Sequence, residues 1–298
     1  MVPVTCPELD ALTRIGVDQQ GRHAALLRVD QSNPFFFDHA LDHVPAMLML
    51  EGMLQLLEGA HGGPGRLHVQ NLVLELHRFC ELTGSSELVA SPAAKKAGSW
   101  SLELEQCNDL VASGSMHAAL RGESDAASSV GLDLRERAEF APAALTHRQR
   151  PENIMLGDFR EIRRERYRAH MLTPPRGHYL RRRPGAERSM TEMIESCRQL
   201  CTLVMHARGI PLGHSFIVSR VSAEFPGPIS RQRPVTLTVT APTGKSHQYA
   251  GEIDITSGGI SVAYSRFEGR IVSESVYARL RRRTASSVRN HGGTHAVR

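Results

Sequence analysis

The chain has 298 residues, of which 41% are hydrophobic and 22% are charged, and its formal net charge is +5. This length and composition are typical of a globular protein with room for two domains, each with its own core. Five cysteines without paired spacing exclude a disulfide framework and favour a reducing compartment. The richest apolar stretch, 44–57, is interrupted by Glu51 and is too short to span a membrane. Because the N-terminus also lacks an export signal, we expect a cytoplasmic protein.

The positive charge is concentrated in two segments. Residues 160–188 contain ten arginines against three glutamates, and residues 281–298 contain five arginines and no acidic residue. Because the rest of the chain is then acidic on balance, this pattern favours one or two docking sites for anions over a surface that coats nucleic acid. A solvated arginine-rich face is the alternative interpretation.

The first half is predicted to contain an early strand, one helix and several later strands, at 22–29, 47–57, 67–82, 99–105 and 110–120. The helix follows Pro45, a favourable first-turn residue, and ends near a glycine-rich run. Residues 121–146 show no sustained period. We therefore predict a first domain over 1–125 and a linker over 126–146.

The second half repeats this order after an arginine-rich, strand-like segment. Its helix is predicted at 189–207, and strands follow at 216–225, 234–241, 249–255 and 260–267. Cys197 and Cys201 lie one turn apart on the helix and are expected to pack in the core. We predict a second domain over 147–280 and a basic disordered tail over 281–298.

Each half thus combines one long apolar helix with several strands that follow one another directly. Strands joined by turns favour antiparallel pairing, and a lone helix buries its apolar side against such a sheet. The pattern predicts an α+β protein. No phosphate-binding glycine loop, nucleophile elbow or paired-cysteine motif is present in the sequence.

A loop histidine followed by a helix glutamate occurs twice. In the first half the loop contains Asp38, His39 and His43, and the helix carries Glu51 and Gln55. In the second half His178 precedes a helix with Glu195, Arg198 and Gln199, and the two glutamates are 144 residues apart. The repetition predicts two related domains that face each other and bring acid and base groups to a shared cleft.

The residue types in this repeat suit acid–base chemistry. A histidine is a ready base near pH 7, and a carboxylate in an apolar setting is an acid with a raised pKa or an orienting partner. The helix N-terminus beside Pro45 offers backbone N–H groups that can polarise a thioester carbonyl. The alternative is that His39 and Glu51 are satisfied locally, but a buried carboxylate is costly, so we favour a functional role.

Glu195 and Arg198 lie three residues apart on one helix face. They form either an intrahelical ion pair or a site in which Arg198 grips a phosphate or carboxylate. Asp38 and His43 are predicted to bind substrate, and Gln55 and Gln199 either bind substrate or join the helix to a strand. Four arginines flank the His178 loop: Arg176, Arg181, Arg182 and Arg183. They either dock an acidic carrier protein or are exposed side chains without a binding role.

A metal site and a cofactor are not expected. His39 and His43 are spaced for one helix face, but they precede Pro45, and no third ligand stands at a recognised spacing.

Several motifs resemble those of the A-factor biosynthesis hot-dog family, the γ-butyrolactone signal synthases of streptomycetes. The segment from Phe36 to Glu51, which reads FFDHALDHVPAMLMLE, is similar to the family signature. Four further segments resemble its other repeat, at 147–157, 175–179, 195–199 and 206–211. The chain departs from the pattern at Ala46, where glycine is usual, and at Leu54, where arginine is common.

The resemblance implies a double hot-dog fold, with two antiparallel sheets each wrapped around a long central helix. It also implies transfer of a β-ketoacyl group from acyl carrier protein to the hydroxyl of dihydroxyacetone phosphate, in butyrolactone-type signal biosynthesis. In such pairs the histidine of one half meets the acid of the other, which would join His39 to Glu195 and Arg198, and His178 to Glu51. An acyl-carrier dehydratase or thioesterase and a non-catalytic acyl-binding hot-dog are the alternatives, and a homodimer is compatible with the sequence.

Overall fold

A computed structural model describes residues 10–63, 65–93, 96–121, 135, 137–182, 187–241 and 248–291, with the backbone alone for 283–291. The strands are β1 (Leu12–Val17), β2 (His23–Leu27), β3 (Leu67–Leu76), β4 (Ser86–Pro92), β5 (Ser99–Gln106), β6 (Asp109–Leu120), β7 (Leu156–Arg163), β8 (Arg166–Met171), β9 (Ser215–Glu224), β10 (Val235–Thr240), β11 (Gln248–Ser257) and β12 (Ile260–Val272). The α-helices are α1 (Ala46–Ala60), α2 (Met190–Ala207) and α3 (Glu274–His291).

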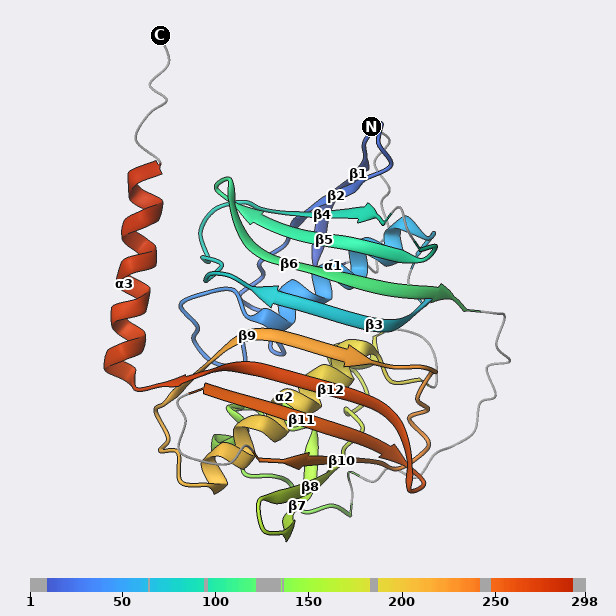
Figure 1. The fold of residues 1–298 in the computed structure, drawn as a ribbon, viewed down its shortest axis with the longest axis vertical. Coiled ribbons are helices and arrows are strands. Elements are labelled where there is room, and N and C mark those ends of the chain that lie inside the picture. Colours follow the sequence, from blue (N-terminus) through green and yellow to red (C-terminus); the bar gives the residue numbers. More distant parts are fainter. Residues whose placement is uncertain are drawn as a thin grey trace.

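All the strands belong to one 12-stranded sheet, in the order β1-β2-β4-β5-β6-β3-β9-β12-β11-β10-β8-β7 (Figure 1). Every pair is antiparallel, and β3 pairs with β9 where the two halves meet, from Asn71↔Glu224 to Glu75↔Arg220. The expectation of two separate sheets is therefore corrected. An unpaired edge leaves backbone N–H and C=O groups without partners, and joining β3 to β9 satisfies both edges.

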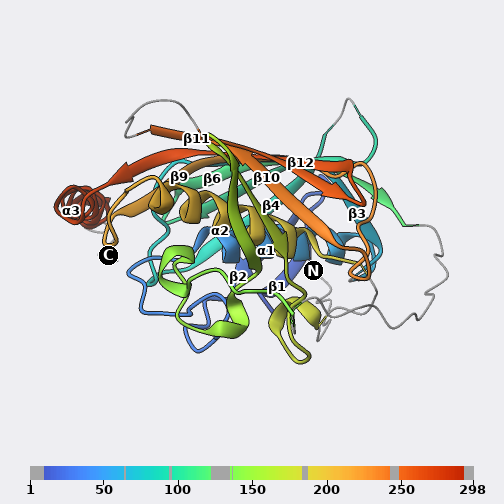
Figure 2. The same ribbon diagram turned by 90° about the horizontal axis from the view of Figure 1, so that it is seen from below.

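Helices α1 and α2 lie on the same face of this sheet (Figure 2). α1 contacts strands β1 to β4, whereas α2 contacts β7, β8, β10 and β12, and the two helices also contact each other. Every residue of α1 from Met47 to Glu58 is buried, so polar groups on this helix must find partners inside the protein. The α+β class, with antiparallel pairing and one long helix in each half, is confirmed.

The segment expected to be a disordered tail is helical as far as His291, because α3 continues through it. α3 stands beside the body of the protein (Figure 1), and Tyr277 and Arg281 bind it to the loop before α1. Residues 292–298, and residues 126–134 and 136 of the predicted linker, lie outside the described residues. Among the helices that the structure describes, none is both long and apolar enough to cross a membrane.

Candidate active site

Glu195 lies in the second turn of α2, and its side chain is completely buried. Its Oε1 lies 2.7 Å from Nη2 of Arg148 and accepts a bond of 2.7 Å from Gln199, while Oε2 accepts a bond of 2.8 Å from Nε of Arg198. Burial raises the pKa of Glu195, but the charges of Arg148 and Arg198 outweigh burial and lower this pKa to about 2. The carboxylate is therefore ionised at neutral pH and is a weak proton acceptor.

The two arginines around Glu195 differ in their freedom to bind a ligand. Arg148 also donates to the carbonyl of Phe35 at 2.8 Å, which occupies its remaining nitrogen, and its side chain is 6% exposed. The Arg198 side chain is 21% exposed, and its Nη1 has no partner among the described residues. Two guanidinium groups share one carboxylate, so the cluster carries an excess positive charge. It can bind an anion through the free end of Arg198.

His39 lies beside this cluster, in the loop that leads into α1. Its side chain is half-buried, Nδ1 is shielded from solvent, and neither ring nitrogen bonds to a described residue. Burial lowers the pKa of His39, and the charges of Arg148 and Arg198 lower it further against the opposing effect of Asp38. A neutral, unpaired imidazole next to a cationic site is suited to act as a base. No hydrogen bond joins His39 to Glu195, because Glu195 binds the arginines instead.

Asp38 joins the loops of the two halves. Its carboxylate accepts hydrogen bonds from the backbone N–H groups of Gln149 and Arg150, at 2.5 and 3.0 Å, and from the Asn153 side chain at 3.0 Å. Gln199 donates to the Asn153 carbonyl at 2.8 Å, which extends the connection to α2. Asp38 and Gln199, predicted to bind substrate, therefore hold the site together through protein contacts.

His178 bonds to Asn153, which also binds Asp38, and does not bond to Glu51. Its Nδ1 accepts from the Leu180 N–H at 3.2 Å, so Nε2 carries the hydrogen and donates to Asn153 at 2.9 Å. Burial, followed by nearby arginine charges, lowers the pKa of His178 to about 4. The charges that act on it include that of Glu195. The predicted pairing of His178 with Glu51 is thus replaced by a bond to Asn153.

Glu51, the counterpart of Glu195, has a different environment. It accepts hydrogen bonds from Gln55 at 2.9 Å and from the Thr191 hydroxyl of α2. Gln55 accepts from the Ala11 backbone and donates toward Tyr179, so it joins α1 to neighbouring segments. A cavity of about 280 Å³ opens beside Tyr179. No arginine occupies the position on α1 that Arg198 occupies on α2, because that residue is Leu54.

His43 lies with α3 rather than with either glutamate. Its Nδ1 is 2.7 Å from Asp42 and 3.2 Å from the Tyr277 hydroxyl. Arg281 binds both Asp42, at 2.9 Å, and Glu81, at 2.7 Å. This position makes His43 part of a contact between α3 and the loop before α1.

The arginines predicted to dock a carrier occupy different environments. Arg176 is exposed, whereas Arg181 is partly buried and donates to the Pro174 carbonyl. Arg182 is exposed but forms an ion pair of 2.7 Å with Asp10. Arg183 lies outside the described residues.

The sequence interpretation assigned no role to Arg148 or to its neighbour His147. His147 has a left-handed backbone (φ 54°), and its Nε2 lies 2.8 Å from Nε2 of His206. Because Nδ1 of His206 donates to the Ile210 carbonyl, His147 is the donor between the two rings. Burial, with Arg198, lowers the pKa of His147 to about 3. The only available signal was that this segment resembles a family motif.

The described residues contain no group of three or more His, Cys, Asp and Glu side chains that could hold a metal ion. Cys197 and Cys201 are both buried, as expected, and burial raises the pKa of each thiol.

Two similar halves, each with a long helix on an antiparallel sheet and a loop that meets the other half, define a protein of the hot-dog class. The chain belongs to the A-factor biosynthesis hotdog domain family (AfsA), whose model matches residues 11–119 and 132–273. No curated protein matches the chain.

Solved structures of low sequence identity share the fold. The dehydratase domain from the CurJ module of curacin polyketide synthase is 13% identical, with a TM-score of 0.59 over 89% of this chain and 98% of that one. The dehydratase domain of PpsC from Mycobacterium tuberculosis, in complex with C12:1-CoA, is also 13% identical, with a TM-score of 0.59 over 88% and 98%. The tesB protein of Mycobacterium avium subspecies paratuberculosis is 9% identical, with a TM-score of 0.56 over 89% and 98%.

Proposed function

We propose that the protein is an acyltransferase that moves a β-ketoacyl group from acyl carrier protein to the hydroxyl of a phosphorylated three-carbon acceptor such as dihydroxyacetone phosphate. Membership of the A-factor biosynthesis family supports acyl-thioester chemistry. The observation that carries the proposal is the placement of a neutral, unpaired His39 beside two arginines that share the single carboxylate of Glu195.

In this mechanism the phosphate of the acceptor binds to the free Nη1 end of Arg198. The imidazole of His39 takes the proton from the acceptor hydroxyl, and the oxygen attacks the thioester carbonyl. A new C–O bond forms as the C–S bond breaks, and the departing carrier thiolate takes the proton back from the imidazolium. Glu195, which the sequence suggested as an acid or an orienting partner, acts as a positioning residue because its pKa of about 2 leaves it ionised and bonded to both arginines.

Arg198→Ala should raise the KM for the phosphorylated acceptor by about tenfold or more, because a charge-assisted bond to phosphate is lost. The KM for the acyl carrier should change little. The measurement is steady-state kinetics with each substrate varied in turn, and Arg208→Ala is a matched control because Arg208 pairs with Glu165 instead. An equal rise in the KM for both substrates would contradict the proposal that Arg198 binds the phosphate of the acceptor.

A dehydratase or thioesterase acting on the same carrier is the second candidate, and dehydratases are among the structural neighbours. Such an enzyme requires His39, but its reaction has no phosphorylated acceptor that would bind to Arg198. Mass spectrometry of products formed with and without dihydroxyacetone phosphate distinguishes the two reactions. An acyl ester formed only with the acceptor supports transfer. An alkene or free acid formed without the acceptor supports the alternative.

A further inference from the structure

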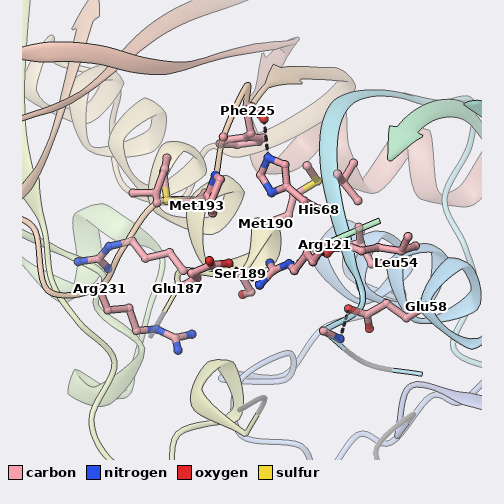
Figure 3. Close-up of a pocket in the computed structure, with 17 residues that line it drawn as sticks. Leu54, Glu58, His68, Arg121, Glu187, Ser189, Met190, Met193, Phe225 and Arg231 are labelled. Atoms are coloured by element: carbon pink, nitrogen blue, oxygen red, sulfur yellow. Dashed lines mark hydrogen bonds and ion pairs between the residues drawn. The ribbon is translucent and has the colours of Figure 1, made fainter. Parts of the chain in front are cut away.

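A second cavity, of about 70 Å³, lies between the two halves and is shown in Figure 3. Its wall is formed by the C-terminal part of α1, the first turn of α2, the start of β3 and the segment that follows β9. His39, Arg148, Glu195 and Arg198 do not line it. The cavity is therefore separate from the candidate active site.

The internal repeat relates one lining residue of this cavity to the candidate active site. The 144-residue offset that relates Glu51 to Glu195 also relates Leu54 to Arg198. Leu54 lines the cavity, together with Met193 of α2 and Phe225 after β9. All three side chains are buried, so this part of the wall is apolar. Leu54, the counterpart of Arg198 in the first half, thus contributes an apolar side chain to this cavity, and Glu51 and His178 do not line it.

Two arginines, Arg188 and Arg231, line the cavity from positions outside α1. Arg188 and Arg231 share Glu192, with distances of 2.5 Å from Arg188 Nη1 to Oε1 and 3.0 Å from Arg231 Nη2 to Oε2. The Arg188 side chain is fully buried, and its Nε has no hydrogen-bond partner among the described residues. Two guanidinium groups thus face one carboxylate, and a buried donor is unsatisfied. An unsatisfied buried donor is costly unless a ligand or water binds it.

Two other features of the wall affect its charge. Ser189 caps α2 by accepting the N–H of Glu192 at 3.1 Å, so the positive end of an 18-residue helix meets the cavity. Arg121 and Glu187 form an ion pair. Glu58 lies on the opposite side of the cavity from Arg231 (Figure 3), and it accepts from the Gly65 N–H at 3.4 Å. Positive charge is therefore in excess on the α2 side.

We propose that this cavity is a second binding site, which takes an organic anion. Its carboxylate or phosphate group binds Arg188, Arg231 and the N-terminus of α2, and a short apolar substituent packs against Leu54, Met193 and Phe225. The small volume limits the substituent to a few carbon atoms. The site does not depend on the proposed acyl transfer, because binding is measured without turnover.

Isothermal titration calorimetry with four probes tests this proposal, in the Arg198→Ala variant so that phosphate binding at the candidate active site does not contribute. Butyrate and butyl phosphate distinguish a carboxylate from a phosphate head group, butyramide is the neutral analogue, and inorganic phosphate is the anion without an apolar group. We expect one of the first two to bind at one site per chain, at least tenfold more tightly than butyramide and inorganic phosphate. The absence of binding by both, or equal binding by butyramide or inorganic phosphate, would overturn the proposal.

Two variants place the binding in this cavity. Arg231→Gln should weaken anion binding by about tenfold, and Glu192 keeps Arg188 as its partner, so the fold should persist. Arg208→Gln, outside the cavity, should leave binding unchanged. Leu54→Phe should fill the cavity and weaken binding, whereas the volume-matched Leu54→Met should not. Melting curves identify the variants that fold, and unchanged affinity in folded Arg231→Gln or Leu54→Phe would contradict the assignment.

Discussion

Glu195 shows how one residue can organise a site without taking part in proton transfer. It binds Arg198 three residues away on the same helix, and it binds Arg148, which is 47 residues away in the chain. The first contact was predictable from helix periodicity. The second was not, because Arg148 reaches α2 through a left-handed turn at His147 that no local pattern encodes. The sequence thus predicted the contact of Glu195 with Arg198 but not its contact with Arg148.

Glu195→Gln should destabilise the fold by about 3–5 kcal/mol, because it leaves two largely buried guanidinium groups without a counter-charge. Chemical denaturation at pH 7 measures this loss. Glu165→Gln, which removes the partly exposed partner of Arg208, is the control and should cost less than about 1 kcal/mol.

The same carboxylate also predicts a pH dependence. The pKa of Glu195 is lowered from 4.5 to about 2 in the folded protein, so its contribution is fully present above pH 4.5 and is lost as the pH falls toward 2. The wild-type protein should therefore lose its stability advantage over Glu195→Gln across this range. A constant difference between the two proteins from pH 7 to pH 3 would contradict this account.

At the scale of elements, apolar periodicity was the most reliable guide. The helix predicted at 189–207 is α2, and the one at 47–57 is the central part of α1. β1 and β4 were not predicted, because β1 carries exposed polar residues and β4 is short and contains small residues and a proline. The part of α3 from residue 281 onward was taken for a disordered tail because its composition is polar and basic, and the contacts that anchor α3 come from distant loops.

α3 is predicted to hold the loop that carries His39. Arg281 bonds to both Asp42 and Glu81, and Asp42 is three residues from His39. Arg281→Ala should therefore increase hydrogen exchange in residues 38–45 and lower kcat/KM several-fold. Mass spectrometry of deuterium uptake measures the first effect.

Arg279→Ala is the matched control for this change, because Arg279 is exposed on the same helix. It should alter neither exchange nor activity. Equal exchange in the Arg281→Ala variant and the wild type would show that α3 does not restrain the loop.

For the whole molecule, the continuous sheet has a consequence for folding. β3 and β9 pair across the two halves, Arg220 of β9 lies 2.8 Å from Glu75 of β3, and Asp38 and Arg148 bind residues of the opposite half. The two-domain division remains a sequence prediction, but these contacts couple the halves. Calorimetry should show one unfolding transition. Two resolved transitions would mean that the halves are stable independently.

The proposed chemistry depends on both halves, because His39 comes from the first and the arginine cluster from the second. The most direct test is the pH dependence of kcat/KM for acyl transfer to dihydroxyacetone phosphate, in the wild type and in His39→Asn. Since the pKa of His39 is lowered from 6.5, wild-type activity should persist at pH 6.5 and fall only at lower pH. His39→Asn should be at least about 100-fold slower and lack this decline. An unchanged rate and pH profile in His39→Asn would contradict the account.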